Sequence, residues 1–253
     1  MQTVTGVGSS LWVKKGAGLY APARRRFPIN GLVYYAPLWH KELQANPFIS
    51  KDLNAHSCAV TGGTWGVKGW AADGDDKITV TSALTQLSAT TQGTLMCNMS
   101  MADETPVDAN ILMSFGDTDA VTIIFLDISS SFPAGGLQAY CTKEGVVQWD
   151  LRTDNQVIMA PNTFYNVAVA HNGTQATLYV NGVAPAQTFL TDTVKASWFS
   201  ACPGIDNGFL GVRSYNNAVT LYMSGVLMDV WAYNRGLSST EINNIYLATK
   251  WRY

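Results

Sequence analysis

Apolar and polar residues alternate along much of the chain beyond its first 30 residues, a pattern typical of β-strands that bury one face. The alternation is cleanest in TLMCNMSM, residues 94–101. One face of this segment consists of Leu95, Cys97, Met99 and Met101. We therefore expect a half-buried strand here.

Turn signals between apolar segments predict several hairpins. NILMSFG and VTIIFLDI flank the turn DTDA, and LQAYCTK and VVQWDLR flank a Glu-Gly pair. Residues 164–182 read as strand, Asn-Gly turn, strand and a second Asn-Gly turn. Further strands are expected at GLVYYAPLW (31–39), FLGVRSY and LYMSGVLMDVWAY.

One helix is predicted near residues 239–248. Ser238 can cap its first turn while Glu241 returns a hydrogen bond, which is the capping-box pattern. One face then carries Ile242, Ile245, Tyr246 and Thr249. No helix is expected between the strands, which excludes a parallel βαβ fold. The expected fold class is therefore all-β, with two antiparallel sheets in a sandwich, one short C-terminal helix and an extended N-terminal arm.

Charge divides the chain of 253 residues into two parts. The first 30 residues hold five basic side chains and no acid, namely Lys14, Lys15, Arg24, Arg25 and Arg26. They carry +5, which leaves −7 for the rest of a chain whose net charge is −2. We assign residues 1–30 to an extended basic arm and residues 31–253 to the sandwich. The arm is either a solvated tail or an assembly arm that docks on an acidic neighbour, such as another copy of the body.

Several classes of protein are disfavoured. The N-terminus has no apolar segment of the secretory type, and no window is long enough to span a bilayer. The small net charge gives no electrostatic case for nucleic acid. The cysteines show no CxxC spacing and are expected to be reduced thiols in the core: Cys58, Cys97, Cys141 and Cys202.

Three stretches, in order, resemble motifs of the laminin-G-like, concanavalin A-like superfamily. AADGDDKITV is similar to the pattern FDGxDDYI, FYNVAVAHNGTQATLYVNG resembles a characteristic hairpin, and MSGVLMDVWAYNRGLSSTEINNIY is similar to GxIDEVRIYNRALSxxEI. The resemblance implies a jelly-roll sandwich of twelve to fourteen strands that is usually non-catalytic and binds sugars or proteins through loops. Residues 31–66 also look like the leader of such modules in proteins of tailed phages.

Asp73, Asp75 and Asp76 form the most acidic short stretch of the chain. The resemblance places them at a turn before a strand, where Asp73 can accept backbone N–H groups. Some members of the superfamily bind calcium, and Asp73 and Asp76 are then the expected ligands. A partner acid is expected in the late strand, but Met228 occupies the first acidic position of that motif and only Asp229 remains. We favour the turn and expect no other cofactor.

Catalytic patterns are missing. Relatives that hydrolyse glycans place acids as E-x-D-x-E on one strand, and no such strand occurs here. His40, His56 and His171 lack the spacing of zinc ligands, and we expect His171, beside an Asn-Gly turn, to be exposed.

Aromatic residues in loops are the remaining candidates for sugar binding, because flat rings cover the apolar faces of sugars. The predicted carbohydrate-binding residues are Trp198, Phe199, Tyr215, Asn216 and Asn217. Trp198 and Phe199 have an alternative role, in which they close one end of the core. The tryptophans expected in the core or on a sheet face are Trp39, Trp70, Trp149 and Trp231.

These patterns predict a non-catalytic binding or structural module, anchored by its arm on the surface of a phage virion as a decoration protein or adhesin. It would assemble in the host cytoplasm without a signal peptide. Its partners would be other virion subunits or copies of itself, and glycans, but neither nucleic acid nor a membrane. A free bacterial lectin-like protein and a divergent glycan hydrolase are the alternatives.

Overall fold

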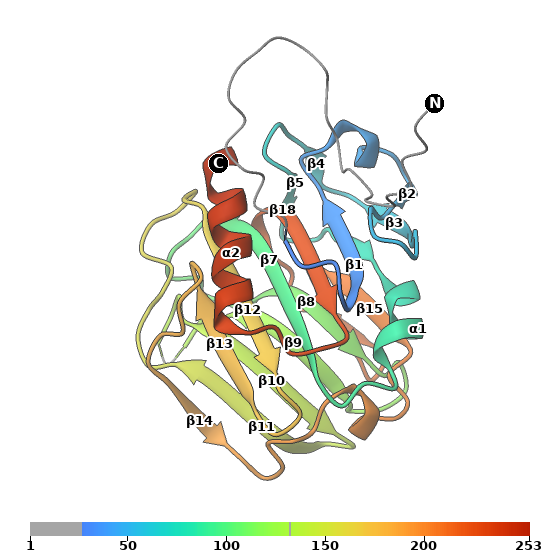
Figure 1. Ribbon diagram of the computed structural model, residues 1–253, viewed down its shortest axis with the longest axis vertical. Helices are drawn as coiled ribbons and strands as arrows, with labels where there is room; N and C mark the ends of the chain where they lie inside the picture. The colour runs from blue at the N-terminus through green and yellow to red at the C-terminus, as the bar shows by residue number, and fades with distance from the viewer. Residues whose placement is uncertain (1–26, 132) are drawn as a thin grey trace, which may run out of the picture.

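Two large antiparallel sheets pack face to face in the computed structural model, which describes residues 27–131 and 133–253 (Figure 1). One sheet has seven strands: β13 (Ala176–Val180), β12 (Tyr165–His171), β7 (Gly93–Met101), β18 (Ser224–Tyr233), β5 (Trp70–Asp73), β4 (Thr64–Trp65) and, also on β18, β1 (Leu32–Pro37).

The second sheet has nine strands, in the order β14 (Gln187–Thr191), β11 (Val146–Thr153), β10 (Leu137–Lys143), β9 (Ile123–Ile128), β8 (Asn110–Gly116), β15 (Asn207–Leu210), β6 (Lys77–Thr79), β3 (Ser57–Thr61) and β2 (Phe48–Ile49). A separate hairpin consists of β16 (Arg213–Tyr215) and β17 (Ala218–Thr220). The predicted fold class is confirmed. The described residues contain eighteen strands, more than the resemblance implied, because several have only two or three residues.

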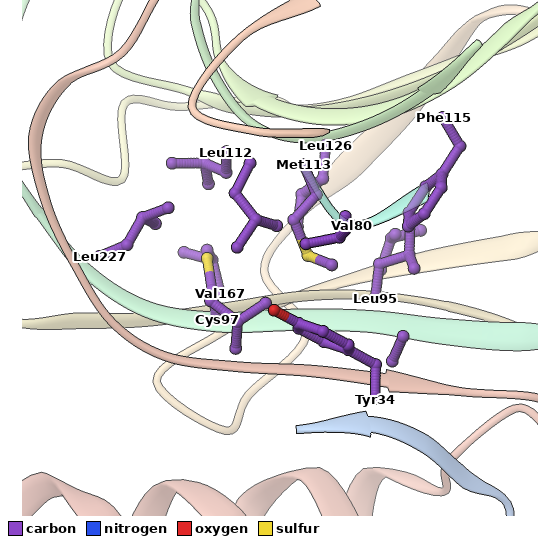
Figure 2. Packing of buried hydrophobic residues seen from close by; sticks show 14 of the residues in the cluster. Tyr34, Val80, Leu95, Cys97, Leu112, Met113, Phe115, Leu126, Val167 and Leu227 are labelled. Carbon is purple, nitrogen blue, oxygen red and sulfur yellow. The ribbon is translucent and has the colours of Figure 1, made fainter. Parts of the chain in front are cut away.

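The main core lies between the two sheets (Figure 2). Leu95 and Cys97 of β7 and Val167 of β12 project from the seven-stranded sheet, and Phe115 of β8 and Leu126 of β9 meet them from the nine-stranded sheet. Each of these positions follows the period of two that the sequence shows. The alternation of apolar residues therefore sets which side of each strand enters the core.

Helix α2 (Ser239–Thr249) confirms the predicted C-terminal helix (Figure 1). Ser238 accepts a hydrogen bond from the backbone N–H of Glu241, and the Glu241 carboxylate accepts one from the backbone N–H of Ser238, so the capping box is complete. Ile242 and Ile245 are fully buried and pack in a second apolar cluster, on the outer face of the seven-stranded sheet.

Strand β7 corrects one expectation. The sequence predicted a half-buried strand, but all nine of its residues are buried. Met96, on the face opposite Cys97, packs in the cluster that contains α2. The helix and its flanking segments cover a face that alternation alone assigns to solvent.

A short helix between strands was not expected. Helix α1 (Leu84–Leu87) follows the 3₁₀ turn η2 (Thr81–Ala83) and connects β6 to β7. These two strands belong to different sheets, so the helix makes no parallel crossover within a sheet. Further 3₁₀ turns are η1 (Lys41–Leu43), η3 (Phe199–Ala201) and η4 (Lys250–Arg252).

Residues 27–30, the last four of the predicted arm, lie against the sandwich. The Phe27 ring packs 5.0 Å from that of Tyr35 and 6.2 Å from that of Trp231, and the Pro28 carbonyl accepts a hydrogen bond from Tyr233. The five basic arm residues, Lys14 to Arg26, lie outside the described residues. No helix in the described part of the chain is long and apolar enough to cross a membrane.

Candidate functional site

The outer face of the nine-stranded sheet carries a mixed set of aromatic and charged side chains. On β9, β10 and β11, inward side chains such as Leu126, Ala139 and Leu151 enter the core. Their neighbours along each strand therefore point to the opposite face. We call the following residues the outer-face cluster: Phe125, Asp127, Gln138, Tyr140, Asp150 and Arg152.

Strand register brings these six residues into two adjacent rows. Gln138 pairs with Asp127 on one side and with Arg152 on the other. In the next row, Tyr140 pairs with Phe125 and with Asp150. Because directly opposite residues in neighbouring strands lie about 5 Å apart, the cluster forms one continuous patch.

Asp150 is the centre of a polar network. Its carboxylate accepts hydrogen bonds from Gln138 Nε2 at 2.7 Å, from Arg152 Nε at 3.1 Å and from the terminal guanidinium nitrogen of Arg152 at 3.0 Å. The Phe125 and Tyr140 rings stack beside it, with centroids 5.0 Å apart and planes at 16°. A bidentate ion pair fixes the Arg152 side chain and leaves its remaining N–H groups oriented.

Asp127 lies at the base of the cluster. It is 1% exposed, and its Oδ1 has no hydrogen-bond partner among the described residues. Burial raises the pKa of Asp127 well above its usual range, and the nearby Asp150 raises it further, while Arg152 and Arg213 oppose the shift. When it is protonated, a carboxyl group acts as a hydrogen-bond donor as well as an acceptor.

The β16–β17 hairpin stands beside the cluster and holds three of the predicted sugar-binding residues. Tyr215 packs against the apolar patch that contains Phe125 and Tyr140, and the Arg213 guanidinium lies 5.1 Å from the Tyr215 ring centroid. Asn216 and Asn217 form the exposed tip, with φ of 48° and 56°. The hairpin therefore places these side chains next to the outer-face cluster.

Trp198 and Phe199 have a different environment. They are 0% and 1% exposed, so neither ring offers a face to a ligand. The Trp198 ring stacks on those of Trp149 and His171, at 6.3 Å and 5.1 Å. The structure therefore favours the alternative role, in which the two residues close one end of the core. Their loop position concealed this burial.

Three of the four tryptophans assigned to the core or a sheet face, Trp70, Trp149 and Trp231, are fully buried. Trp39 follows β1 rather than lying on a strand, and it is half-buried.

His171 also corrects an expectation, because it is fully buried rather than exposed. Its Nδ1 accepts a hydrogen bond from the backbone N–H of Gly173 at 3.1 Å, and Nε2 lies 2.8 Å from the Lys195 carbonyl. This arrangement fits a neutral ring with its proton on Nε2, and burial lowers the pKa of His171.

We expect the free energy of unfolding to fall as the pH drops below about 6.5, the ordinary histidine pKa. The unfolded chain takes up a proton there, whereas folded His171 resists one until a lower pH. The stability that comes from the neutral His171 ring is fully present above about 6.5, and it is lost as the pH falls towards the lowered pKa of the folded state. Urea unfolding between neutral and mildly acidic pH measures the slope. His171→Gln should flatten the slope, and an unchanged slope in this variant would assign the dependence to other groups.

The acidic turn holds Asp73, Asp75 and Asp76 with one carboxylate oxygen of each within 4.8 Å of the others. Asp76 is buried and accepts backbone N–H groups from Gly63 at 2.5 Å and from Asp73 at 3.0 Å. The expected turn is present, but Asp76 rather than Asp73 is the acceptor. Repulsion from Asp76, above all, raises the pKa of exposed Asp73.

A cleft of about 510 Å³ lies beside this turn, and Gly74, Asp103, Asp108 and Tyr222 are among its lining residues. No lysine, arginine or histidine lines it. Among the described residues, the carboxylates of the two flanking loops form no ion pair: Asp73, Asp75, Asp103, Glu104 and Asp108. This end of the sandwich is therefore an unneutralised acidic surface.

Comparison with known families decides the classification. Residues 72–243 match the model of the concanavalin A-like lectin/glucanases superfamily, laminin G type. The chain belongs to this superfamily. No curated protein matches it in sequence.

Solved structures that resemble this superfamily member include carbohydrate-binding modules and sialidases. The CBM40 module of the Ruminococcus gnavus IT-sialidase is 18% identical, with a TM-score of 0.57, and the match covers 74% of this chain and 97% of that one. The same module bound to α2,3-sialyllactose gives a TM-score of 0.58. Trypanosoma rangeli sialidase is 16% identical, with a TM-score of 0.60, over 88% of this chain and 33% of that one. At these identities the likeness concerns the fold.

Asp229, the acid that remains in the superfamily's late motif, has another role. It is fully buried and forms an ion pair with Arg252 at 3.3 Å. Its carboxylate also accepts hydrogen bonds from Tyr35, Trp39, Asn98 and Tyr253. With its oxygens occupied in this way, Asp229 is not a free partner for the acidic turn.

We expect calcium and chelators to leave the melting temperature unchanged, because both oxygens of Asp76 already accept backbone hydrogen bonds. An ion that binds only the folded state must raise stability. Thermal unfolding with added calcium, compared with a chelator, measures this. A rise that Asp73→Asn abolishes would establish the calcium site instead.

No motif in the sequence singles out the residues of the outer-face cluster. Gln138 and Tyr140, and Asp150 and Arg152, occupy alternate positions of two strands that were correctly predicted as a hairpin. That alternation was the available signal. Their meeting with Asp127 depends on the β9–β10 register.

Proposed function

We propose that this chain is a non-catalytic carbohydrate-binding module whose ligand lies on the outer-face cluster. The observation that carries the proposal is the half-buried Tyr140 ring, which stacks on the buried Phe125 ring, beside an oriented Arg152–Asp150–Gln138 network on one face of the sheet. Rings cover the apolar faces of sugars, and fixed polar groups bind their hydroxyls. The structurally similar CBM40 module binds sialyllactose, which makes sialylated glycans the first ligands to test.

The test is a titration of the full chain with α2,3- and α2,6-sialyllactose, preceded by a glycan array. Tyr140→Ala is expected to weaken binding at least tenfold, a loss of about 1.4 kcal/mol, because it removes the stacking surface. Trp251→Ala is the matched control, since that ring is 75% exposed in η4, away from the cluster. An array without hits, or equal loss in both variants, would contradict the proposed site.

The non-catalytic part of the proposal rests on the state of the two carboxyl groups. Most glycoside hydrolases use one carboxylic acid and one free carboxylate, whereas sialidases use a tyrosine nucleophile. Asp127 can stay protonated, but Asp150 is already held by Arg152 and Gln138, which leaves no free carboxylate in the cluster. Release of sugar from a chromogenic sialoside, lost in Asp127→Asn, would support the hydrolase alternative instead.

A second candidate function is a structural role in a larger assembly, such as a phage virion. The observation that favours it is charge complementarity between the acidic cleft and the arm, which carries five basic residues and no acid. We propose that the arm of one copy, or of a neighbouring subunit, pairs with such a surface.

Sedimentation at low and high salt tests the assembly role. Self-association should weaken with salt and disappear when Arg24, Arg25 and Arg26 are changed to Glu. Asp103→Asn with Asp108→Asn should have the same effect, whereas Asp192→Asn, a matched surface change, should not. A chain that is monomeric at all concentrations would favour the free lectin-like alternative.

A further inference from the structure

Two of the four cysteines lie against each other in the core. Cys141, on β10, and Cys202, directly after η3, have their sulfur atoms 3.5 Å apart. They are 0% and 2% exposed. Cys58 and Cys97 are also buried, but among the described residues neither is hydrogen-bonded to another cysteine. Cys58 contacts Tyr34 and the His56 carbonyl instead.

We propose that Cys141 and Cys202 are an oxidisable dithiol, and that peroxide converts them to a disulfide that ties the loop after β14 to β10, the third strand of the nine-stranded sheet. The sulfur atoms need to approach by only about 1.5 Å, from 3.5 Å to bonding distance. Shared between two side chains, this shift is below about 1 Å each. The inference is independent of the proposed glycan binding.

The two thiols are not equivalent. Either thiol can donate in the hydrogen bond that joins them. With Cys141 as the donor, this bond lowers the pKa of Cys202, and Lys143 lowers it further, while burial opposes the shift. The same hydrogen bond, together with burial, raises the pKa of Cys141. Burial raises the pKa of Cys58 to about 11, so that thiol is less reactive. Cys202 is therefore the nucleophile, because the thiolate is the reactive form.

The reaction balances with hydrogen peroxide as the oxidant. The Cys202 thiolate attacks one peroxide oxygen and breaks the O–O bond, which gives a sulfenic acid and releases hydroxide. The Cys141 sulfur then attacks the Cys202 sulfur, and the S–O bond of the sulfenic acid breaks. The two thiol protons end on the two oxygens that came from peroxide. Two thiols lose two electrons in total, peroxide gains them, and two water molecules form.

Peroxide can reach the pair from one side of the fold. Pro203 and Gly204, which follow Cys202, are exposed, and the segment is a turn rather than part of a sheet. Peroxide is close to water in size, so a small local opening of this turn admits it. Cys97 lies in the middle of β7, between two neighbouring strands, and lacks such access.

The experiment treats the full chain with hydrogen peroxide and follows mass, peptide map and melting temperature. We expect a mass loss of about 2 Da and a tryptic fragment that joins Cys141 to Cys202. The link closes a loop with a sequence separation of 61 residues, so the melting temperature should rise by roughly 10 °C. Cys202→Ser should lose both effects, and Cys97→Ser is the matched control that should keep them.

The map of the wild-type chain decides the question even if a variant fails to fold. Four free thiols after treatment, a gain in mass at Cys202 without a cross-link, or a link to Cys58 or Cys97 would each overturn the proposal. A cross-link that lowers the melting temperature would show that the native core does not accommodate the bond, and would overturn it as well.

Discussion

Replacement of Asp229 by alanine should lower the free energy of unfolding by about 3–5 kcal/mol, the usual cost of removing one partner of a buried ion pair. The carboxylate is fully buried and binds groups from three separate parts of the chain. Its partners are Tyr35, Trp39, Asn98, Arg252 and Tyr253. Alanine leaves the Arg252 charge and several donors without an acceptor. Each such group that stays buried without a partner lowers the stability of the folded protein.

Urea unfolding of the wild type and of Asp229→Ala measures this loss. The matched control is Asp192→Ala, because Asp192 forms a surface ion pair with Lys195 at 3.1 Å and is 64% exposed. Surface pairs contribute about 1 kcal/mol or less. If the two variants lost similar stability, the Asp229 network would not hold the C-terminal segment in the way the hydrogen bonds indicate.

Replacement of Trp198 by alanine should cost about 3–5 kcal/mol, the range for removal of a large buried aromatic side chain. The ring stacks on Trp149 and His171 and meets Phe199 edge-on at 5.3 Å. Gly93 lies so close that a Cβ there would be 2.6 Å from Trp198 Nε1, which indicates that the backbone is fitted to the ring. Alanine would leave a cavity that this close packing cannot readily fill.

Thermal unfolding of Trp198→Ala, with Trp251→Ala as the exposed control, checks this prediction. A core role also means that glycan affinity per folded molecule stays unchanged in Trp198→Ala. A stable variant that no longer binds glycan would return Trp198 to the list of ligand-contacting residues and would contradict its assignment to the core.

Local patterns predicted the elements whose determinants are local. The capping box fixed the start of α2, and Glu144 and Gly145, with φ of 49° and 81°, form the turn expected between β10 and β11. The burial of both faces of β7 was not predictable in this way. It depends on where α2 packs, which is decided by contacts between distant parts of the chain.

The candidate site was predicted less well for the same reason. Trp198 and the hairpin tip at Asn216 both have the local composition of exposed loops, but only the tip is exposed. The outer-face cluster joins residues of three strands, and its members become neighbours only once the register is set. The sequence shows which residues of one strand share a face, but it does not show which residues of neighbouring strands lie opposite them.

The position of β18 has a consequence for how the protein is made. This strand lies inside the seven-stranded sheet, with β7 on one side and β5 and β1 on the other (Figure 1). It is also the last of the described strands along the chain, so β1 pairs with a segment that is synthesised almost 200 residues later. A ribosome must synthesise Tyr233 before the sheet can close, and until then the edges of β7 and β5 are unpaired. The nascent chain is therefore exposed to aggregation through these unpaired edges until β18 has been synthesised, and a molecular chaperone would protect it best during that interval.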